Sequence, residues 1–389
     1  MTSKNWSISS DSVDLRENLK GIDYVLLGLV CALVLFGLIM VYSSSFIYAQ
    51  ERTGDGFAFI KKQLIFATLG FVALFFALRV PYRKWADWYY PVGLAAVGLL
   101  AIVLIPGVGS RVLGAQRWLK LGPISVQPSE IAKFAMILFV ARQLEKKKEI
   151  LHRFVPGVLS NFIVPLPAML LLLLQPDFGS TVMITVVIFL MMFLAGVPKR
   201  YLGGIFLLGG GSAAALVLGS PYRRARLMTF LDPWQDPLGK GFQVLQSMLG
   251  VHNGSIFGVG LGNGKEKLFY LPEAHNDFIF AVIGEELGFI GVCAVILAFC
   301  FFIYRGLKIA SDCWEEKQDR FGSLAATGIT LALGLQGFVN MGVVLGLLPT
   351  KGLTLPFVSY GGSALVVDLF AIGILLNISK GNPCVPPSS

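Results

Sequence analysis

The sequence predicts an all-α polytopic membrane protein with about ten transmembrane helices. Of its 389 residues, 55% are hydrophobic and only 14% are charged, whereas a soluble domain carries about a quarter charged residues to cover its surface. The apolar residues form long runs, as in 24–41, 91–106 and 162–174, which is typical of helices surrounded by lipid. The net charge of +9 is then better explained by loop topology than by nucleic-acid binding, and we expect no nucleic-acid partner.

Ten segments are long enough to cross a bilayer at about 20 residues for each span. Several of them begin or end near a proline, such as Pro81, Pro106 and Pro198, where the missing N–H costs little. The predicted spans lie at 22–46, 61–79, 88–106, 128–145, 156–174, 179–197, 201–219, 276–304, 322–345 and 359–379. They make one membrane domain, 22–379, between an N-terminal tail, 1–21, and a C-terminal tail, 380–389.

The Lys and Arg residues give the predicted orientation. With the N-terminus inside, the inside segments hold 18 of the 32 Lys and Arg residues and the short outside loops hold seven. Because cytoplasmic loops are the ones enriched in these residues, we expect both tails to be cytoplasmic. The long loop 220–275, between the seventh and eighth spans, then lies outside and is long enough to build a structured site. No fixed-period repeat or pair of interrupted helices indicates an inverted-repeat transporter.

The first group of candidate site residues enters the fourth span. A charge in a membrane span costs about 2.5–3.5 kcal/mol and usually faces a cavity or a partner. Glu130 and Lys133 are three residues apart on one helix face and can neutralise each other. They form either a structural ion pair, with Ser129 near the helix start, or a site in which Glu130 holds Lys133. In that second interpretation Lys133 and Arg117 offer cations to an anionic substrate.

The motif 175–181, Gln-Pro-Asp-Phe-Gly-Ser-Thr, makes a second group between two spans. Pro, Asp, Gly and Ser at this spacing are typical of a turn followed by a helix N-cap. We therefore interpret this group as structural.

The third group comprises the outer loop and the start of the eighth span. Its glycines in 258–264 match neither nucleotide-binding pattern, and no strand precedes them. Asp277 stands at the start of the span, where it is either the helix N-cap or a general base. At 100° per residue, Glu285 lies about 80° from Asp277 around the helix and Glu286 about 180°. Glu285 can share the face of Asp277, and we expect Glu286 to contact another helix.

The fourth group, 348–363, enters the last span with two prolines and paired glycines. This composition predicts an irregular segment, which is tolerated at membrane depth only where it lines a cavity. Its Lys351 has no oppositely charged neighbour in the sequence. All four groups lie at the outer ends of predicted spans, so they could converge on one outward-facing site.

Together these motifs closely resemble the SEDS family (shape, elongation, division and sporulation), and within it the division-type members. The resemblance covers nearly the whole chain, with Asn276 at a position where the family commonly has Thr. The segments that carry it are 40–45, 127–133, 175–181, 272–280, 284–288 and 356–363. It implies a ten-span peptidoglycan glycosyltransferase that polymerises lipid II into glycan strands on the outer face of the bacterial cytoplasmic membrane, during septal cell-wall synthesis. It also implies that Asp277 is the catalytic aspartate.

The resemblance further implies partners: lipid II and the nascent glycan strand, a class B penicillin-binding protein acting as transpeptidase, other divisome membrane proteins, and membrane lipids. The transfer needs one base, Asp277, and positive charge for the leaving diphosphate. A divalent cation could share the phosphate role, but no multi-carboxylate cage is visible, and we assign neither a metal site nor another cofactor. The residues assigned to substrate binding are Arg117, Gln127, Ser129, Glu130, Lys133, Arg226, His275, Glu285, Lys351 and Ser359.

Three alternatives remain beside this interpretation. A lipid II flippase would need charged groups leading to the inner side, whereas the motifs cluster outside. A non-catalytic divisome scaffold would not need a base beside cations in one pocket. Within the family, only the resemblance distinguishes a division-type polymerase from an elongation-type polymerase of the RodA kind.

Overall fold

The computed structural model describes residues 21–112, 115–122, 124–239, 241–271 and 274–380. Of the predicted tails 1–21 and 380–389, all but Gly21 and Lys380 lie outside the described residues. These two residues lie against each other, since a Cβ on Gly21 would come within 2.9 Å of the Lys380 carbonyl oxygen. The first and last described helices therefore begin and end at the same end of the molecule.

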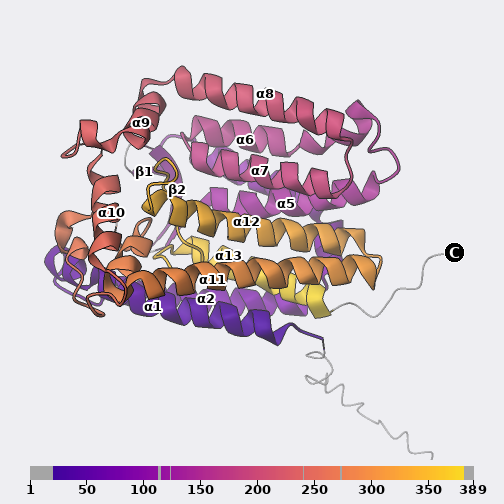
Figure 1. Cartoon of the computed structure of the whole chain (residues 1–389). Helices are drawn as coiled ribbons and strands as arrows, with labels where there is room; N and C mark the ends of the chain where they lie inside the picture. The colour runs from indigo at the N-terminus through magenta and orange to yellow at the C-terminus, as the bar shows by residue number, and fades with distance from the viewer. Residues whose placement is uncertain (1–20, 113–114, 123, 240, 272–273, 381–389) are drawn as a thin grey trace, which may run out of the picture.

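The long helices lie roughly parallel in one bundle (Figure 1). Nine of the predicted spans have one helix each as their counterpart: α1 (Tyr24–Thr53), α2 (Ala58–Arg79), α4 (Tyr89–Val103), α5 (Pro128–Lys146), α7 (Phe178–Leu194), α8 (Lys199–Leu218), α11 (Ile279–Glu315), α12 (Arg320–Val344) and α13 (Ser363–Lys380). The remaining span, 156–174, is built from π-helix η2 (Phe154–Val158), 3-10 helix η3 (Leu159–Phe162) and α6 (Pro165–Leu174).

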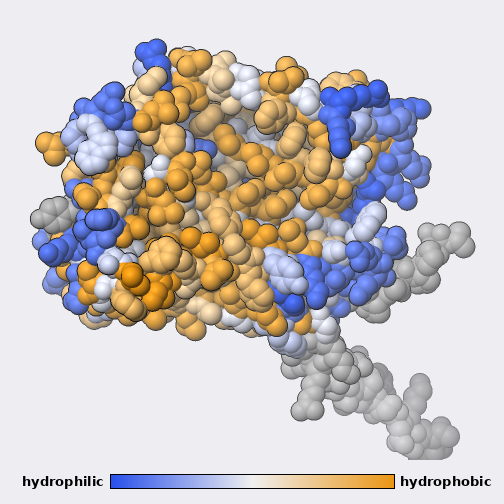
Figure 2. Space-filling model, in the orientation of Figure 1, coloured by the Kyte–Doolittle hydropathy of each residue, from blue (hydrophilic) through white to orange (hydrophobic). Residues whose placement is uncertain are grey.

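The surface of the bundle is that of a membrane protein. Within the described residues, seven helical segments are long and apolar enough to cross a membrane, and α4 and α7 are shorter apolar helices. An apolar band lies across the visible face, between two hydrophilic ends (Figure 2). Apolar side chains on this surface are largely exposed, for example Leu207 at 74% and Leu297 at 66%. Such a surface is stable only against lipid, which confirms the polytopic membrane fold.

Helices α5, α12 and α13 form the centre of the bundle. Helix α5 packs against α4, α7 and α12, whereas α13 packs against α2 and α12. Helix α5 is buried at almost every position from Pro128 to Leu144, and large side chains such as Phe139, Phe299 and Phe321 are fully enclosed. The charged residues buried within these helices, Glu130, Lys133 and Asp368, therefore face protein rather than lipid.

The prediction that the chain is all-α is wrong between α4 and α5. Three short strands, β1 (Gly109–Val112), β2 (Ala115–Leu121) and β3 (Ile124–Val126), form an antiparallel sheet in the order β1-β2-β3. Ser110 pairs with Trp118, and Lys120 pairs with Ser125. Within β2, Leu119 is buried and its neighbour Lys120 is exposed, as expected where successive side chains point to opposite faces of a strand. The segment is too short and too polar for a membrane span, and the sequence predicts a loop there.

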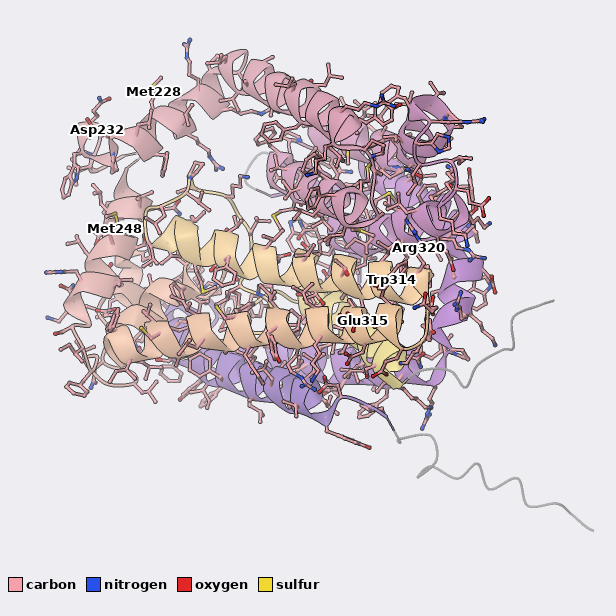
Figure 3. The ribbon with its side chains drawn as sticks, turned by 45° about the vertical axis from the view of Figure 1, so that its right-hand side comes forward. Met228, Asp232, Met248, Trp314, Glu315 and Arg320 are labelled. Atoms are coloured by element: carbon pink, nitrogen blue, oxygen red, sulfur yellow. The ribbon has the colours of Figure 1, made fainter. Side chains whose placement is uncertain are left out.

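The remaining elements lie outside the predicted spans. Helix α3 (Tyr82–Asp87) connects α2 to α4, and the loop 220–275 contains α9 (Pro221–Leu231), 3-10 helix η4 (Pro233–Gln235), α10 (Phe242–Asn253) and π-helix η5 (Glu266–Tyr270). Met228 and Asp232 at α9 and Met248 on α10 lie at the end of the bundle opposite Trp314, Glu315 and Arg320 (Figure 3). The long loop is thus a folded unit at one end of the bundle.

Helix α11 is interrupted near its beginning. Gly288 has φ 66° and ψ −164°, outside the helical region. The N–H groups of 259–260 donate to the carbonyls of 285–286 at 3.0 and 3.1 Å, and those of 289–290 donate to the carbonyls of 255–256 at 2.9 and 3.3 Å. The loop 220–275 therefore satisfies the backbone groups that the break leaves open. Beyond the break, α11 continues to Glu315, past the predicted end at 304.

The predicted orientation can be tested with two exposed positions at opposite ends of the bundle. Leu238 in the long outer loop is 89% exposed, and Lys148 after α5 is also exposed. In a cysteine-free background, Leu238→Cys should react with an impermeant thiol reagent added to intact spheroplasts, whereas Lys148→Cys should react only after lysis. Labelling of Lys148→Cys alone before lysis would invert the orientation.

Candidate functional site

Asp277 lies immediately before α11. The N-cap position of this helix is Phe278 and the helix begins at Ile279, so the alternative in which Asp277 is the N-cap is wrong. The backbone carbonyl of Asp277 accepts a hydrogen bond from Asn340 Nδ2 at 2.7 Å, and its side chain is partly exposed. The backbone is thus held in place and the residue is not fully enclosed, as a general base requires.

The irregular segment 345–362, between α12 and α13, passes beside this carboxylate. A Cβ added to Gly352 would lie 3.1 Å from Asp277 Oδ2. Asn340 also donates to the Leu353 carbonyl, at 2.6 Å, so one amide fixes both segments. The position before Gly352 is Lys351, which places an ammonium group on the segment that contacts the base. The predicted irregular backbone at 348–363 is confirmed.

Cations gather around Phe178 at the start of α7. The Lys351 ammonium lies 5.8 Å from the centroid of the Phe178 ring, and the Arg223 guanidinium lies 5.4 Å from it. Arg226 Nη1 donates to the Thr350 carbonyl at 3.4 Å. Burial lowers the pKa of Lys351. Arg226 on α9 thus binds the Lys351 segment. Arg223, also on α9, lies near the same Phe178 ring as Lys351 and is not among the predicted site residues.

Arg117 on β2 binds the connection between α6 and α7. Its Nε donates to the Gln175 carbonyl at 3.1 Å, and Nη2 donates to the Pro176 carbonyl. Asp177 then caps α7, accepting from the Ser180 N–H at 3.2 Å and the Ser180 hydroxyl at 2.8 Å. The structural interpretation of 175–181 is confirmed, and Arg117 fixes this turn through backbone carbonyls.

His275 and Ser359 hold the segments on either side of the base. The buried His275 ring lies 4.7 Å from the Phe59 ring and 5.4 Å from the Tyr48 ring. The His275 carbonyl accepts from the Tyr360 N–H at 3.0 Å. The Ser359 hydroxyl accepts from the Leu355 N–H at 2.9 Å. Both side chains therefore pack within the protein and stabilise the approach to Asp277.

Glu130 and Lys133 form the predicted ion pair, with 2.7 Å between Glu130 Oε2 and Lys133 Nζ. The ammonium also donates to Gln336 Oε1 at 2.6 Å, and it lies 3.8 Å from Asp368 Oδ1. All four residues are buried, with at most 6% of each residue exposed. Gln336 and Asp368 are not among the predicted site residues, although a carboxylate within the apolar span 359–379 is a signal that identifies Asp368 as a candidate.

Gln127 and Ser129 stand at the start of α5. Gln127 occupies the N-cap position without a side-chain cap bond, and its N–H donates to the Ser363 hydroxyl at 3.1 Å. The buried Ser129 hydroxyl has no hydrogen-bond partner among the described residues. Gln127 therefore connects the start of α5 to the start of α13 rather than to the segment around Asp277.

Glu285 and Glu286 fasten the outer loop to α11. Glu285 accepts from the N–H of Lys265 at 2.7 Å and of Glu266 at 3.2 Å. Glu286 accepts from Lys267 Nζ at 2.6 Å and from the Ser43 hydroxyl at 2.7 Å. The prediction that Glu286 contacts another helix is confirmed, since Ser43 belongs to α1. Glu285 accepts hydrogen bonds from the backbone of the loop 220–275. Its role in substrate binding stays a prediction.

Glu266 offers a pH test of this junction. Burial, and secondly the charge of Glu285, raise the pKa of Glu266 from about 4.5 to about 7. Between these values the folded protein holds a proton that the unfolded chain releases, so this group makes stability fall as pH rises from about 4.5 to about 7. Glu266→Gln should flatten this part of the profile, as measured by thermal unfolding at pH 5, 6, 7 and 8. An unchanged slope would contradict the assignment.

The predicted site residues named next therefore form two groups, which make their contacts in different parts of the bundle. Asp277, Lys351 and Arg226 meet at the segment 350–352, and the pair Glu130–Lys133 lies buried between α5, α12 and α13. Within the described ranges, no three His, Cys, Asp or Glu side chains gather as metal ligands. A donor set for a divalent cation is thus not identified there.

Comparison with known proteins gives consistent results. Residues 24–383 match the family of FtsW, RodA and SpoVE, described as "Cell cycle protein". The chain is 46% identical over 378 residues to the probable peptidoglycan glycosyltransferase FtsW of Geobacter metallireducens, covering 96% of this chain and 100% of the relative. It is 42% identical over 358 residues to the stage V sporulation protein E of Bacillus subtilis, covering 92% and 97%.

The fold of this chain also resembles those of solved structures. A chain of the structure described as "Structural coordination of polymerization and crosslinking by a peptidoglycan synthase complex" matches with a TM-score of 0.74 and 31% identity, covering 93% of this chain and 98% of that one. The rod shape determining protein RodA of Thermus thermophilus matches with a TM-score of 0.69 and 29% identity, again covering 93% and 98%.

Proposed function

The chain belongs to the SEDS family of FtsW, RodA and SpoVE, and from this premise we propose that it is a peptidoglycan glycosyltransferase that polymerises lipid II. The proposal is supported by the names of its full-length relatives. The observation that carries it is local: the Asp277 carboxylate lies beside Gly352, next to Lys351, on a segment whose Thr350 carbonyl binds Arg226. A base beside cations is the arrangement that glycosyl transfer from a diphosphate requires.

In the proposed reaction, the 4-hydroxyl oxygen of an acceptor sugar attacks the anomeric carbon of a donor, whose configuration inverts. Asp277 takes the hydroxyl proton as the new glycosidic bond forms. The bond from the anomeric carbon to the diphosphate oxygen breaks, and undecaprenyl pyrophosphate leaves with the electron pair. Lys351 and Arg226, with Arg223 nearby, stabilise the negative charge that develops on this diphosphate. Lys133 is more buried and already bonded to Glu130 and Gln336, so we assign it a supporting position.

We further propose that the reaction takes place on the outer face of the cytoplasmic membrane, at the division septum. The partner would be a class B penicillin-binding protein that cross-links the new strand. The similarity to a chain from a structure on polymerization and crosslinking supports this partner. We expect contact at the loop 220–275 and at the outer face of α11 and α12, where side chains such as Phe289 and Ile290 are exposed at 63% and 52%.

The test is glycan formation from lipid II by the purified protein, with and without its transpeptidase. Polymer chains resolved on a gel would support the proposal. Transport of lipid II across liposome membranes without polymer would favour the flippase, and absence of both activities would favour a scaffold. Depletion in the native organism separates the two roles within the family, because loss of a division enzyme yields filaments and loss of an elongation enzyme yields rounded cells.

A further inference from the structure

Lys133 occupies an unusual electrostatic position between two carboxylates. Its Nζ lies 2.7 Å from Glu130 Oε2 and 3.8 Å from Asp368 Oδ1. Asp368 is 1% exposed, and its Oδ1 has no hydrogen-bond partner among the described residues. Two carboxylates and one ammonium leave this cluster, when ionised, with one excess negative charge in a buried place. Such an excess costs stability, so a stability role alone does not explain Asp368.

The same ammonium fixes the orientation of Gln336. An ammonium only donates hydrogen bonds, so the Gln336 oxygen must face Lys133, at 2.6 Å, and the amide nitrogen must face away from it. That nitrogen donates to the Thr354 carbonyl at 3.1 Å. The charge on Lys133 therefore determines which way the amide points, and the amide binds the segment that carries Lys351.

A second amide on the same face of α12 completes the connection. Asn340 follows Gln336 by four residues, so the two side chains project from one face of the helix. Asn340 holds the carbonyls of Leu353 and Asp277, at 2.6 and 2.7 Å. The neighbouring backbone carbonyls of Leu353 and Thr354 are thus both held from α12, next to the Gly352 that contacts the Asp277 carboxylate.

We propose that Asp368 and Gln336 are positioning residues for glycosyl transfer. Asp368, together with Glu130, holds the Lys133 ammonium in place; Lys133 orients Gln336; and Gln336 fixes the segment 351–354 against Asp277. The proposal rests on the function proposed above. It gives the excess carboxylate a use, since Asp368 is a second anion that holds the Lys133 ammonium in place beside the Gln336 amide.

Asp368→Asn separates function from folding, because it leaves Glu130 and Lys133 as a neutral pair. We expect this variant to fold with unchanged or higher thermal stability. Gln336→Met removes the hydrogen bonds to Lys133 and to the Thr354 carbonyl and keeps a side chain of similar length. In each variant kcat for lipid II polymerisation should fall about 10- to 100-fold, the range expected for a misplacement of about 1 Å, while KM changes less than threefold. Thr327→Val, on the same helix and bonded only within it, is the control.

A second measurement does not depend on activity. In a cysteine-free background, Thr350→Cys reports the accessibility of the segment through its rate of reaction with an impermeant thiol reagent. The rate should rise severalfold with Asp368→Asn or Gln336→Met and stay unchanged with Thr327→Val. Unchanged labelling in both variants, or an equal kcat loss in the control, would overturn the proposal. If the parent makes no glycan, the proposed function fails, while the labelling still decides whether the cluster positions this segment.

Discussion

Replacing Asp277 with asparagine is expected to lower the rate of glycan formation from lipid II by roughly a hundredfold to ten-thousandfold, the contribution of a general base. Asparagine has nearly the same size as aspartate, so it fits beside Gly352. The bond from Asn340 goes to the backbone of Asp277 and survives the change. Since Phe278 holds the cap position, helix α11 loses no cap either. What disappears is the capacity to accept a proton at neutral pH.

The matched control is Asp232→Asn in the same outer loop. Asp232 is an exposed carboxylate that accepts from the Trp234 N–H at 3.2 Å, a bond that asparagine can also make. This control should polymerise at the parent rate. If Asp277→Asn stays within a few-fold of the parent in the same assay, with equal yield and thermal stability, Asp277 is not the base. The catalytic assignment must then move to another group.

The sequence predicts the helices well because lipid exposure leaves a simple pattern. Each of the ten predicted spans has helical counterparts, and Pro128 and Pro198 mark helix starts as expected. The pair Glu130–Lys133 was predictable because residues three apart on one helix meet whatever the tertiary structure is. Local chemistry likewise identified the cap at Asp177. These features depend on neighbours in the sequence or on the solvent, and not on the packing of distant segments.

The features that sequence analysis missed depend on long-range contacts. Asp368 lies in an apolar span and Gln336 in another, and only the packing of α5, α12 and α13 brings them to Lys133. The interruption of α11 at Gly288 is stabilised by a loop that precedes it by about thirty residues. The hydropathy pattern predicts one continuous helix over 276–304. Hydropathy depends on which residues are apolar and not on where the backbone hydrogen bonds are made.

The second large effect is expected at Lys133. Replacing it with methionine removes the only cation within ion-pair distance of both buried carboxylates among the described residues. Glu130 and Asp368 then face each other as like charges without a counter-ion. Breaking a buried pair in this way costs about 3–5 kcal/mol, a large part of the roughly 5–15 kcal/mol by which a typical protein is stable. We expect a strongly reduced yield of folded protein and a lower thermal unfolding temperature.

We expect the unpaired carboxylates, and not the missing lysine packing, to cause the loss of folded protein in Lys133→Met. A combined variant distinguishes these two causes. Lys133→Met with Glu130→Gln and Asp368→Asn leaves no ionised group in the cluster, and neutral replacements of buried ion networks are often as stable as the original. Folded yield should therefore recover in the triple variant. Lys308→Met, at an exposed position of α11, should match the parent throughout. If Lys133→Met alone folds as well as the parent, the carboxylates are already neutral in the folded protein, and Lys133 cannot owe its orientation to their charge.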